Sequence, residues 1–195
     1  MPEITPAPKR QQILTAAFHV FAEKGYHNAK IEEIAQVAQV GKGTVYEYFQ
    51  SKNQLFQEML KAEMTAFEHT LTEKLESEES TRGKLVILIE KNIELGNDYR
   101  PLAKIAFMET NILEGTFRDW MINLYKVRVK IIEGIIQKGI NNGEIRPINP
   151  RLFTSLFYSA LGALHSPFTQ DDLALAAPKS YAEEIIDYFY HGIAI

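Results

Sequence analysis

The sequence of 195 residues predicts an all-α protein, and the number of helices it predicts is about nine. Apolar residues recur three and four residues apart along most of the chain, as they do on one face of a helix. No stretch alternates apolar and polar residues in the way that a half-buried strand does. Glycines and prolines separate the periodic segments, at positions typical of helix ends.

The first three predicted helices are short and lie within residues 9–51. The first carries apolar residues at helical spacing up to Gly25, a residue that favours a helix end. The second begins near Ile31, and the third, just after Gly43, has room for about two turns. We expect a small three-helix bundle here, preceded by a flexible tail at residues 1–8.

Longer helices are predicted for the rest of the chain. Ser51 and Gln54 have the spacing of a capping box, which favours the start of a fourth helix. Asn149 and Pro150 favour another start as a cap and a first helical residue. The predicted helices cover residues 51–75, 82–97, 101–113, 116–142 and 149–165, and a last segment after Pro178. We expect them to form a larger second domain at residues 52–195.

Charge is uneven along the chain. The whole chain has a net charge of −4, but residues 9–55 contain six Lys and Arg against four Glu, a balance of +2. The remainder is therefore acidic, and we expect the two parts to have different partners. The absence of cysteine excludes disulfides, iron–sulfur clusters, thiol catalysis and cysteine-rich zinc sites. The start of the chain lacks a signal-peptide pattern and no apolar run is long enough to cross a bilayer, so we expect a cytoplasmic protein.

The segment "VGKGTVYEYFQSKNQLF" at residues 40–56 carries the strongest functional signal. If residues 43–49 form a helix that turns by about 100° per residue, Val45 and Phe49 point the same way, into the bundle. Gly43, Thr44 and Glu47 then point directly outward, and Tyr46 and Tyr48 lie at the two flanks. Small or polar side chains at the tip can approach base edges in a DNA groove, and flanking hydroxyl groups can bond phosphates. The pattern is that of a helix-turn-helix.

Residues around this helix favour the same interpretation. Gly41 allows the backbone to come close to a phosphodiester chain. Lys42 precedes the helix and Lys52 starts the next one, so both can meet phosphates beside helix N-termini. Lys9 and Arg10 either reach a neighbouring groove as an arm or are simply solvent-exposed.

The aromatic and acidic residues of the segment also have structural interpretations. Tyr46 and Tyr48 are aromatic residues of a kind that often packs half-buried on a core. Glu47 repels the DNA backbone, so it either accepts a hydrogen bond from a cytosine amino group or is solvated. Within the whole pattern we predict DNA contact for Lys42, Thr44 and Tyr48, and we leave contact and packing both open for Tyr46.

A family resemblance adds to these observations. The stretch "IEEIAQVAQVGKGTVYEYFQSKNQLF" follows a helix that reads "RQQILTAAFHVFAEKGY". The residues at the family's spacings are Phe21, Gly25, Ile34, Ala35, Ala38, Val40, Gly43, Tyr46, Phe49, Lys52 and Leu55. With them, residues 9–56 resemble the DNA-binding domain of the TetR family of bacterial transcriptional repressors. The resemblance implies an all-helical homodimer with a larger C-terminal domain for ligand binding and dimerisation.

The predicted function is therefore that of a repressor that binds a palindromic operator as a homodimer and is released by a small hydrophobic or amphipathic effector. A ligand-responsive activator is one alternative, and a helical protein-interaction module without DNA binding is another. No cofactor, metal or membrane partner is expected.

Two positions depart from the family's pattern. Gln39 stands where members usually have a glycine in the turn, and a left-handed backbone there strains a non-glycine residue by about 1 kcal/mol. Lys30 stands where the second helix usually starts with threonine. It loses a good cap but places a charge near phosphate, so we include Lys30 among the predicted DNA-binding residues.

Two helices near the C-terminus are predicted to form the dimer interface. A strip of small residues, which lets another helix approach closely, is formed by Ser155, Ser159 and Gly162. One face of the last helix carries Tyr181, Ile185, Tyr188 and Phe189. As the resemblance implies, two such helices from each subunit make a four-helix interface. The alternative is that both stripes serve only the core of their own chain.

Polar residues scattered among apolar helices are the candidates for an effector pocket. A pocket with apolar walls and a few polar anchors fits a hydrophobic or amphipathic molecule. The candidates are Asn92, Tyr99, Glu109, Trp120, Tyr125, Arg128, Tyr158 and His165. Each of them also has an ordinary structural role as an alternative. Trp120 and Tyr125 are preferred because large aromatic residues often line such cavities.

An enzyme is the competing class of protein. All five histidines are isolated, with no HExxH pair and no glycine-rich phosphate loop. Serine with distant histidine and aspartate occurs by chance in most chains of this size. The sequence therefore predicts no catalytic residues.

Overall fold

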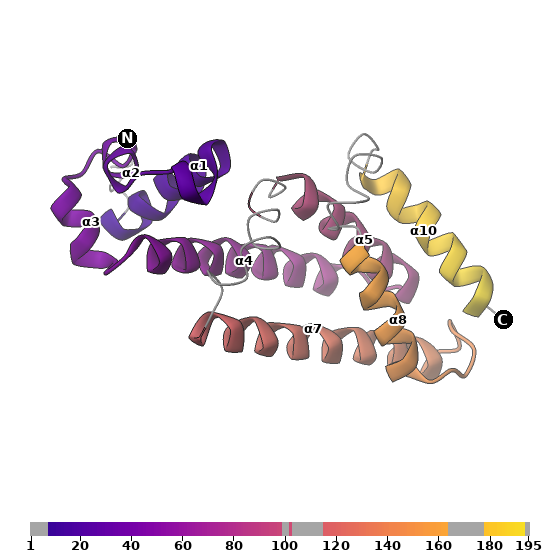
Figure 1. The fold of residues 1–195 in the computed structure, drawn as a ribbon. Coiled ribbons are helices and arrows are strands. Elements are labelled where there is room, and N and C mark those ends of the chain that lie inside the picture. Colours follow the sequence, from indigo (N-terminus) through magenta and orange to yellow (C-terminus); the bar gives the residue numbers. More distant parts are fainter. Residues whose placement is uncertain (1–7, 99–101, 103–114, 164–177, 194–195) are drawn as a thin grey trace, which may run out of the picture. The chain divides into compact units, whose positions relative to one another are not determined.

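The computed structural model describes residues 8–98, 102, 115–163 and 178–193, and every element within these ranges is a helix (Figure 1). The helices are α1 (Lys9–Asn28), α2 (Ile31–Val37), α3 (Lys42–Tyr48), α4 (Lys52–Ser77), α5 (Thr81–Asp98), α7 (Thr116–Asn141), α8 (Pro150–Ala163) and α10 (Pro178–Ile193). The all-α class is confirmed. The predicted helix at 101–113 lies almost entirely outside the described ranges.

The chain divides into two compact units. Of the described residues, the N-terminal unit contains 8–66 and Leu102, and the C-terminal unit contains 67–98, 115–163 and 178–193. The division falls inside α4, which therefore contributes to both units. None of the described helices combines the length and the apolar character that a membrane span requires.

The N-terminal unit has an aromatic core where α1 meets the start of α4. Phe21 and Phe56 are fully buried, and their rings meet edge to face with centroids 4.9 Å apart. Tyr26 stacks on Phe21 at 5.9 Å. Gly25 has φ of 73°, so the regular helical backbone of α1 is interrupted at the position where the sequence predicts a helix end.

The turn between α2 and α3 has the left-handed backbone that the sequence predicts. Gln39 has φ of 55°, the only positive φ among the described non-glycine residues. Its N–H donates to Gln36 O at 3.1 Å, and the N–H of Val40 donates to Ala35 O at 2.9 Å, as at a helix C-terminus. These bonds hold Gln39 in a conformation that glycine adopts more easily.

Side-chain caps fix where three of the helices begin. The N–H of Gln54 donates to Ser51 Oγ at 3.0 Å before α4, and the N–H of Leu152 donates to Asn149 Oδ1 at 3.1 Å at the start of α8. At α2 the cap is reversed, because the Glu33 carboxylate accepts the N–H of Lys30 at 3.4 Å. This bond supports the helix start although Lys30 itself has no capping acceptor.

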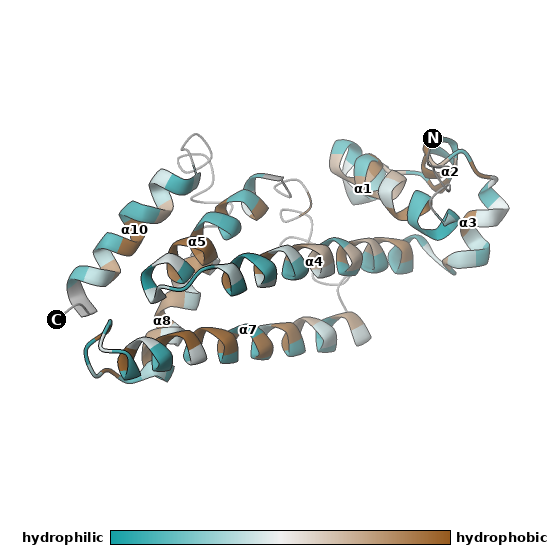
Figure 2. Cartoon of the chain, turned by 180° about the vertical axis from the view of Figure 1, so that it is seen from behind, coloured by the Kyte–Doolittle hydropathy of each residue, from teal (hydrophilic) through white to brown (hydrophobic). Residues whose placement is uncertain are grey.

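The C-terminal unit is held together by one apolar core shared by its helices. Along α4 and α7, hydrophobic and hydrophilic residues alternate around each helix (Figure 2). Ile89 of α5, Ile136 of α7, Phe157 of α8 and Ile186 of α10 are all buried in this core. Arg82 of α5 forms an ion pair with Asp187 of α10 at 2.7 Å.

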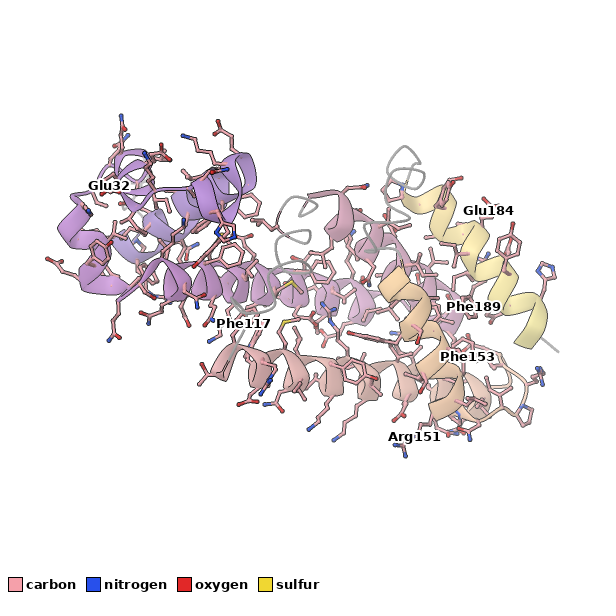
Figure 3. The ribbon with its side chains drawn as sticks, in the orientation of Figure 1. Glu32, Phe117, Arg151, Phe153, Glu184 and Phe189 are labelled. Carbon is pink, nitrogen blue, oxygen red and sulfur yellow. The ribbon has the colours of Figure 1, made fainter. Side chains whose placement is uncertain are left out.

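The aromatic part of this core joins α8 and α10. The ring of Phe189 on α10 lies 5.8 Å from Phe153 on α8, edge to face (both are labelled in Figure 3). It also lies 5.5 Å from Phe157, again edge to face. Phe153 and Phe157 stack on each other at 5.8 Å. Such pairs add to the free energy gained by burial alone. One side of α8 is thus fixed against its own chain.

Candidate nucleic-acid interface and ligand cavity

The orientation of α3 agrees with the helix geometry predicted from the sequence. Val45 is 1% exposed and Phe49, which follows the helix in an extended conformation, is 2% exposed. Gly43 and Glu47 are exposed on the opposite side, as are Tyr46 and Tyr48. Thr44, which we predicted to point directly outward, is instead half-buried, because it lies only about 100° around the helix from the buried Val45. The buried anchors therefore hold a polar, hydroxyl-bearing face of α3 free of the chain's own core.

Lys42 at the start of α3 interacts with an acidic residue of α2. Its ammonium forms an ion pair with Glu32 and lies 5.9 Å from the centre of the Tyr46 ring. The hydrogen bond between the two side chains raises the pKa of Lys42 and lowers the pKa of Glu32. Both groups are exposed, so Lys42 is fully charged and reachable by a phosphate, which then competes with Glu32.

Glu32→Gln is expected to strengthen DNA binding. The substitution removes the carboxylate that occupies Lys42, so one more cation is available to a phosphate. Because exposed ion pairs are weak, affinity for duplex DNA at low salt should rise only by roughly two- to fivefold. Fluorescence anisotropy over a series of salt concentrations measures this. Glu23→Gln is the control, since it removes the same charge from an exposed position of α1. If both variants gained the same DNA affinity, the effect would come from net charge and not from the competition of Glu32 for Lys42.

Lys52 lies in a different environment from the one the sequence suggests. Its ammonium donates to the carbonyl oxygen of His27 at 3.1 Å and sits 4.7 Å from the centre of the Tyr26 ring. Burial lowers the pKa of Lys52. These contacts join the start of α4 to the end of α1. Lys52 therefore positions the helices of the N-terminal unit in addition to any contact with phosphate.

The other cations of this unit are distributed around the helix-turn-helix. Arg10 forms an ion pair with Glu58 at 3.0 Å and its guanidinium lies 5.5 Å from the centre of the Phe49 ring. Lys30 is exposed at the start of α2, and Gly41 is exposed as the N-cap residue of α3. Arg10 thus packs against Phe49, which anchors the end of α3, while Lys30 and Gly41 lie on the surface.

The C-terminal unit contains a small cavity of about 20 Å³. That volume holds about one water molecule. The described residues that line it come from α4, α5, α7 and α8: Glu68, Leu71, Thr72, Leu75, Leu88, Asn92, Arg128, Ile131, Ile132, Tyr158 and Leu161. Six of these are leucine or isoleucine, and the other five carry polar groups, a mixture that small-molecule sites also have.

An ion pair between α4 and α7 forms the polar side of the cavity. Arg128 donates to Glu68 Oε1 from Nε at 2.6 Å and also from an Nη nitrogen. Burial lowers the pKa of Arg128, but hydrogen bonds and charge from Glu68, with a contribution from Tyr158, raise it overall. The Phe67 ring lies 5.4 Å from the guanidinium. These contacts hold a permanent cation at the cavity wall.

Three of the predicted effector residues line the cavity. They are Asn92, Arg128 and Tyr158. Tyr125 is 46% exposed and meets Tyr158 edge to face at 4.8 Å, while Trp120 lies beside Phe117 at 5.6 Å. Neither of these two preferred aromatic residues lines the cavity. The other candidates, Tyr99, Glu109 and His165, lie outside the described residues.

Glu68 is the main cavity residue that sequence reasoning missed. It lies at i, i+4 and i+7 spacing with Thr72 and Leu75, so the three share one face of α4. A carboxylate on the same face as an apolar stripe is a signal for a buried partner. The partner, Arg128, is 60 residues away in sequence and could not be paired from the pattern.

The predicted dimer residues divide between the core and the surface. Ser155, Ser159 and Gly162 are exposed on α8, on the side away from Phe153 and Phe157. Tyr188 of α10 is 72% exposed. The remaining three residues of α10 are half-buried against the chain's own core: Tyr181, Ile185 and Phe189.

Two leucines on the exposed side of α8 were not among the predicted dimer residues. Leu152 and Leu156 are each 60% exposed, which is unusual for large apolar residues one helical turn apart. They flank Ser155 and share its side of the helix. Leu152 and Leu156 are four residues apart and lie next to the small-residue strip, and this spacing could have identified them from the sequence.

Comparisons with known proteins agree with this organisation. "Bacterial regulatory proteins, tetR family" matches residues 13–59, and "YsiA-like protein, C-terminal region" matches residues 56–166, more than half of the chain. The chain is 28% identical over 166 residues to the fatty acid metabolism regulator protein of Bacillus subtilis (strain 168), covering 85% of this chain and 86% of that protein.

Two solved structures share the fold. The transcriptional regulator FadR from Bacillus subtilis in complex with stearoyl-CoA has a TM-score of 0.72 and 25% identity, covering 91% of this chain and 95% of that one. AibR in complex with isovaleryl coenzyme A and operator DNA has a TM-score of 0.69, covers 92% and 96%, and at 21% identity supports the fold alone. These matched proteins are regulators. The chain belongs to the TetR family of bacterial regulatory proteins and is a DNA-binding transcriptional regulator.

Proposed function

We propose that the protein is a homodimeric repressor that binds a palindromic operator through α3 and leaves it when an amphipathic molecule with an acyl chain enters the C-terminal cavity. In this proposal residues 9–51 bind DNA in the cytoplasm, and residues 52–195 bind the effector and the second subunit. The observation that carries the proposal is the orientation of α3, in which Val45 and Phe49 are buried and the face that carries Glu47 is exposed.

On the DNA side, each proposed contact suits the chemistry of its residue. Glu47 and the half-buried Thr44 are proposed to meet base edges, and the hydroxyl of Tyr48 and the ammonium of Lys42 are proposed to meet phosphates. The lesser contacts are proposed for Lys30, Gly41, Gly43, Tyr46 and Lys52. A dimer sets two copies of α3 in successive major grooves, about 34 to 36 Å apart.

The dimer interface is proposed on the exposed side of α8 and on Tyr188 of α10. Leu152 and Leu156 supply apolar surface, and Ser155 and Ser159 allow a second helix to approach closely. An exposed apolar stripe of this kind is typical of a subunit contact.

For the effector, an acyl chain fits both the cavity walls and the comparisons. The walls are leucine and isoleucine with a polar side at Arg128. The Bacillus subtilis relatives are a regulator of fatty acid metabolism and a regulator in complex with stearoyl-CoA. A drug-sized ligand occupies at least about 300 Å³, so the 20 Å³ cavity must open by moving its walls.

Opening the cavity provides the link to DNA. Glu68, Leu71 and Leu75 of α4 are wall residues, and α4 begins at Lys52, directly after the helix-turn-helix. A ligand that displaces this part of α4 therefore changes the placement of α3 in the dimer. A coupling free energy of about 1 to 3 kcal/mol changes DNA affinity by roughly 5- to 150-fold.

The test is DNA release by acyl compounds. A duplex that the full-length protein selects from a random pool is bound, and decanoate, decanoyl-CoA and stearoyl-CoA are titrated while anisotropy is followed. The proposal expects at least one of them to weaken binding by roughly 5- to 150-fold. An affinity that none of them changes contradicts the effector class, and failure to select any DNA favours a protein-interaction module.

A further inference from the structure

We propose that the cavity recognises an anionic head group through Arg128, and that Glu68 is the internal anion that this head group displaces. The inference rests on the proposed function, because it concerns the same cavity, and it names the chemistry of the effector. Acidic amphiphiles should act as effectors, whereas neutral molecules with the same chain should act weakly or not at all.

The guanidinium of Arg128 can bind a second anion in place of Glu68. Glu68 uses a single carboxylate oxygen, Oε1, to accept from Nε and one Nη nitrogen. A guanidinium has five N–H donors in a planar fork, so this arrangement leaves donors on its other edge. The Phe67 ring, 5.4 Å from the guanidinium carbon, packs against the fork.

Charge within the cavity makes the exchange necessary. The described lining residues contain one cation and one anion, Arg128 and Glu68, whose side chains are 15% and 20% exposed. A carboxylate or phosphate that enters this poorly solvated space brings a second negative charge against one positive charge. Like charges in such a site repel strongly, so the incoming anion binds well only if Glu68 leaves.

The departure of Glu68 connects head-group recognition to α4. Glu68 lies on α4 and Arg128 lies on α7, so their ion pair ties the two helices together at the cavity. An anion that binds Arg128 breaks this ion pair. α4 then loses its link to α7 and can move further than the entry of the acyl chain alone requires. A neutral molecule must also move the apolar walls to enter, but it brings no charge that competes with Glu68, so the ion pair can stay intact.

The experiment compares three probes with one chain length: decanoate, decanol and decanoyl-CoA. Calorimetry measures their binding to the full-length protein, and anisotropy measures the DNA release they cause. The variants are Glu68→Gln, which removes the competing charge and keeps the shape, and Arg128→Gln, which removes the anion's partner. Arg128→Lys restores the cation, and Thr72→Val is the control because it changes an uncharged lining residue.

For the anionic probe that binds the parent, Glu68→Gln should raise affinity by roughly tenfold and Arg128→Gln should lower it by at least as much. Arg128→Lys should recover part of the loss, and decanol should respond to neither change. Whether decanoate or decanoyl-CoA shows the effect identifies the anion as a carboxylate or a phosphate.

Equal shifts for decanol and the anions, or no shift in Glu68→Gln, would overturn the anion exchange. That result leaves the proposed function intact as long as any probe releases DNA from the parent. If no probe binds the parent protein, the proposed effector class fails and the inference fails with it.

Discussion

Replacing Phe49 by alanine is expected to lower the free energy of unfolding of the N-terminal unit by about 3 to 5 kcal/mol. Phe49 is 2% exposed, and its ring is one of the largest fully buried side chains in the described residues. Truncation leaves a cavity between α3 and the rest of the unit, and it removes the ring beside which the Arg10 guanidinium lies. Urea unfolding of the full-length protein, followed by circular dichroism at fixed protein concentration, measures the change.

Tyr46→Ala is the matched control for Phe49→Ala. Tyr46 lies three residues earlier and is 46% exposed, so its truncation should change stability by no more than about 0.5 kcal/mol. If Phe49→Ala unfolds like the parent while Tyr46→Ala is strongly destabilised, the inward and outward faces of α3 have been exchanged in our interpretation.

The second large effect is expected at Phe157, whose truncation should cost about 3 to 5 kcal/mol of stability in the C-terminal unit. Phe157 is fully buried and its ring contacts both Phe153 and Phe189. Losing it removes the centre of the aromatic cluster that joins α8 to α10. The same urea experiment detects this as a lower midpoint for the C-terminal unit.

Leu156→Ala, one residue earlier, should behave in the opposite way. Leu156 is 60% exposed, so the protomer should fold normally, but removing its apolar surface should weaken dimerisation. Analytical ultracentrifugation over a range of concentrations separates the two effects, since dimer and protomer stability are linked by mass action. A Leu156→Ala protein that dimerises as tightly as the parent would place the subunit contact elsewhere.

Local patterns were sufficient to predict several features of the helix-turn-helix. The inward direction of Val45 follows from the helical period alone, and Phe49 is buried beside it although it lies just past the end of α3 in an extended conformation. Gly25 and Gln39 were also predictable, because a positive φ is a property of a single residue in a turn. Each of these features depends on neighbours close in sequence.

The cavity was less predictable because its polar pair is assembled from distant segments. Arg128 was a candidate, but nothing in its neighbourhood identifies Glu68, which is supplied by another helix. Trp120 and Tyr125 were preferred for their size, yet the side of α7 on which a residue lies decides whether it reaches the cavity. Tertiary packing sets that side.

Lys52 shows the same limit for a charged residue. Its position at the start of α4 suggested a phosphate contact, and that contact stays a prediction. The structure adds the His27 carbonyl and the Tyr26 ring as partners, which no local pattern reveals because they belong to α1.

The most direct test of the central claim is to compare the DNA sites selected from a random pool by the parent protein and by Thr44→Ala and Glu47→Ala. If the outward face of α3 reads bases, the parent enriches a site with twofold symmetry, and each variant changes the preferred bases at matching positions of both halves. Identical selected sites for all three proteins would contradict the claim.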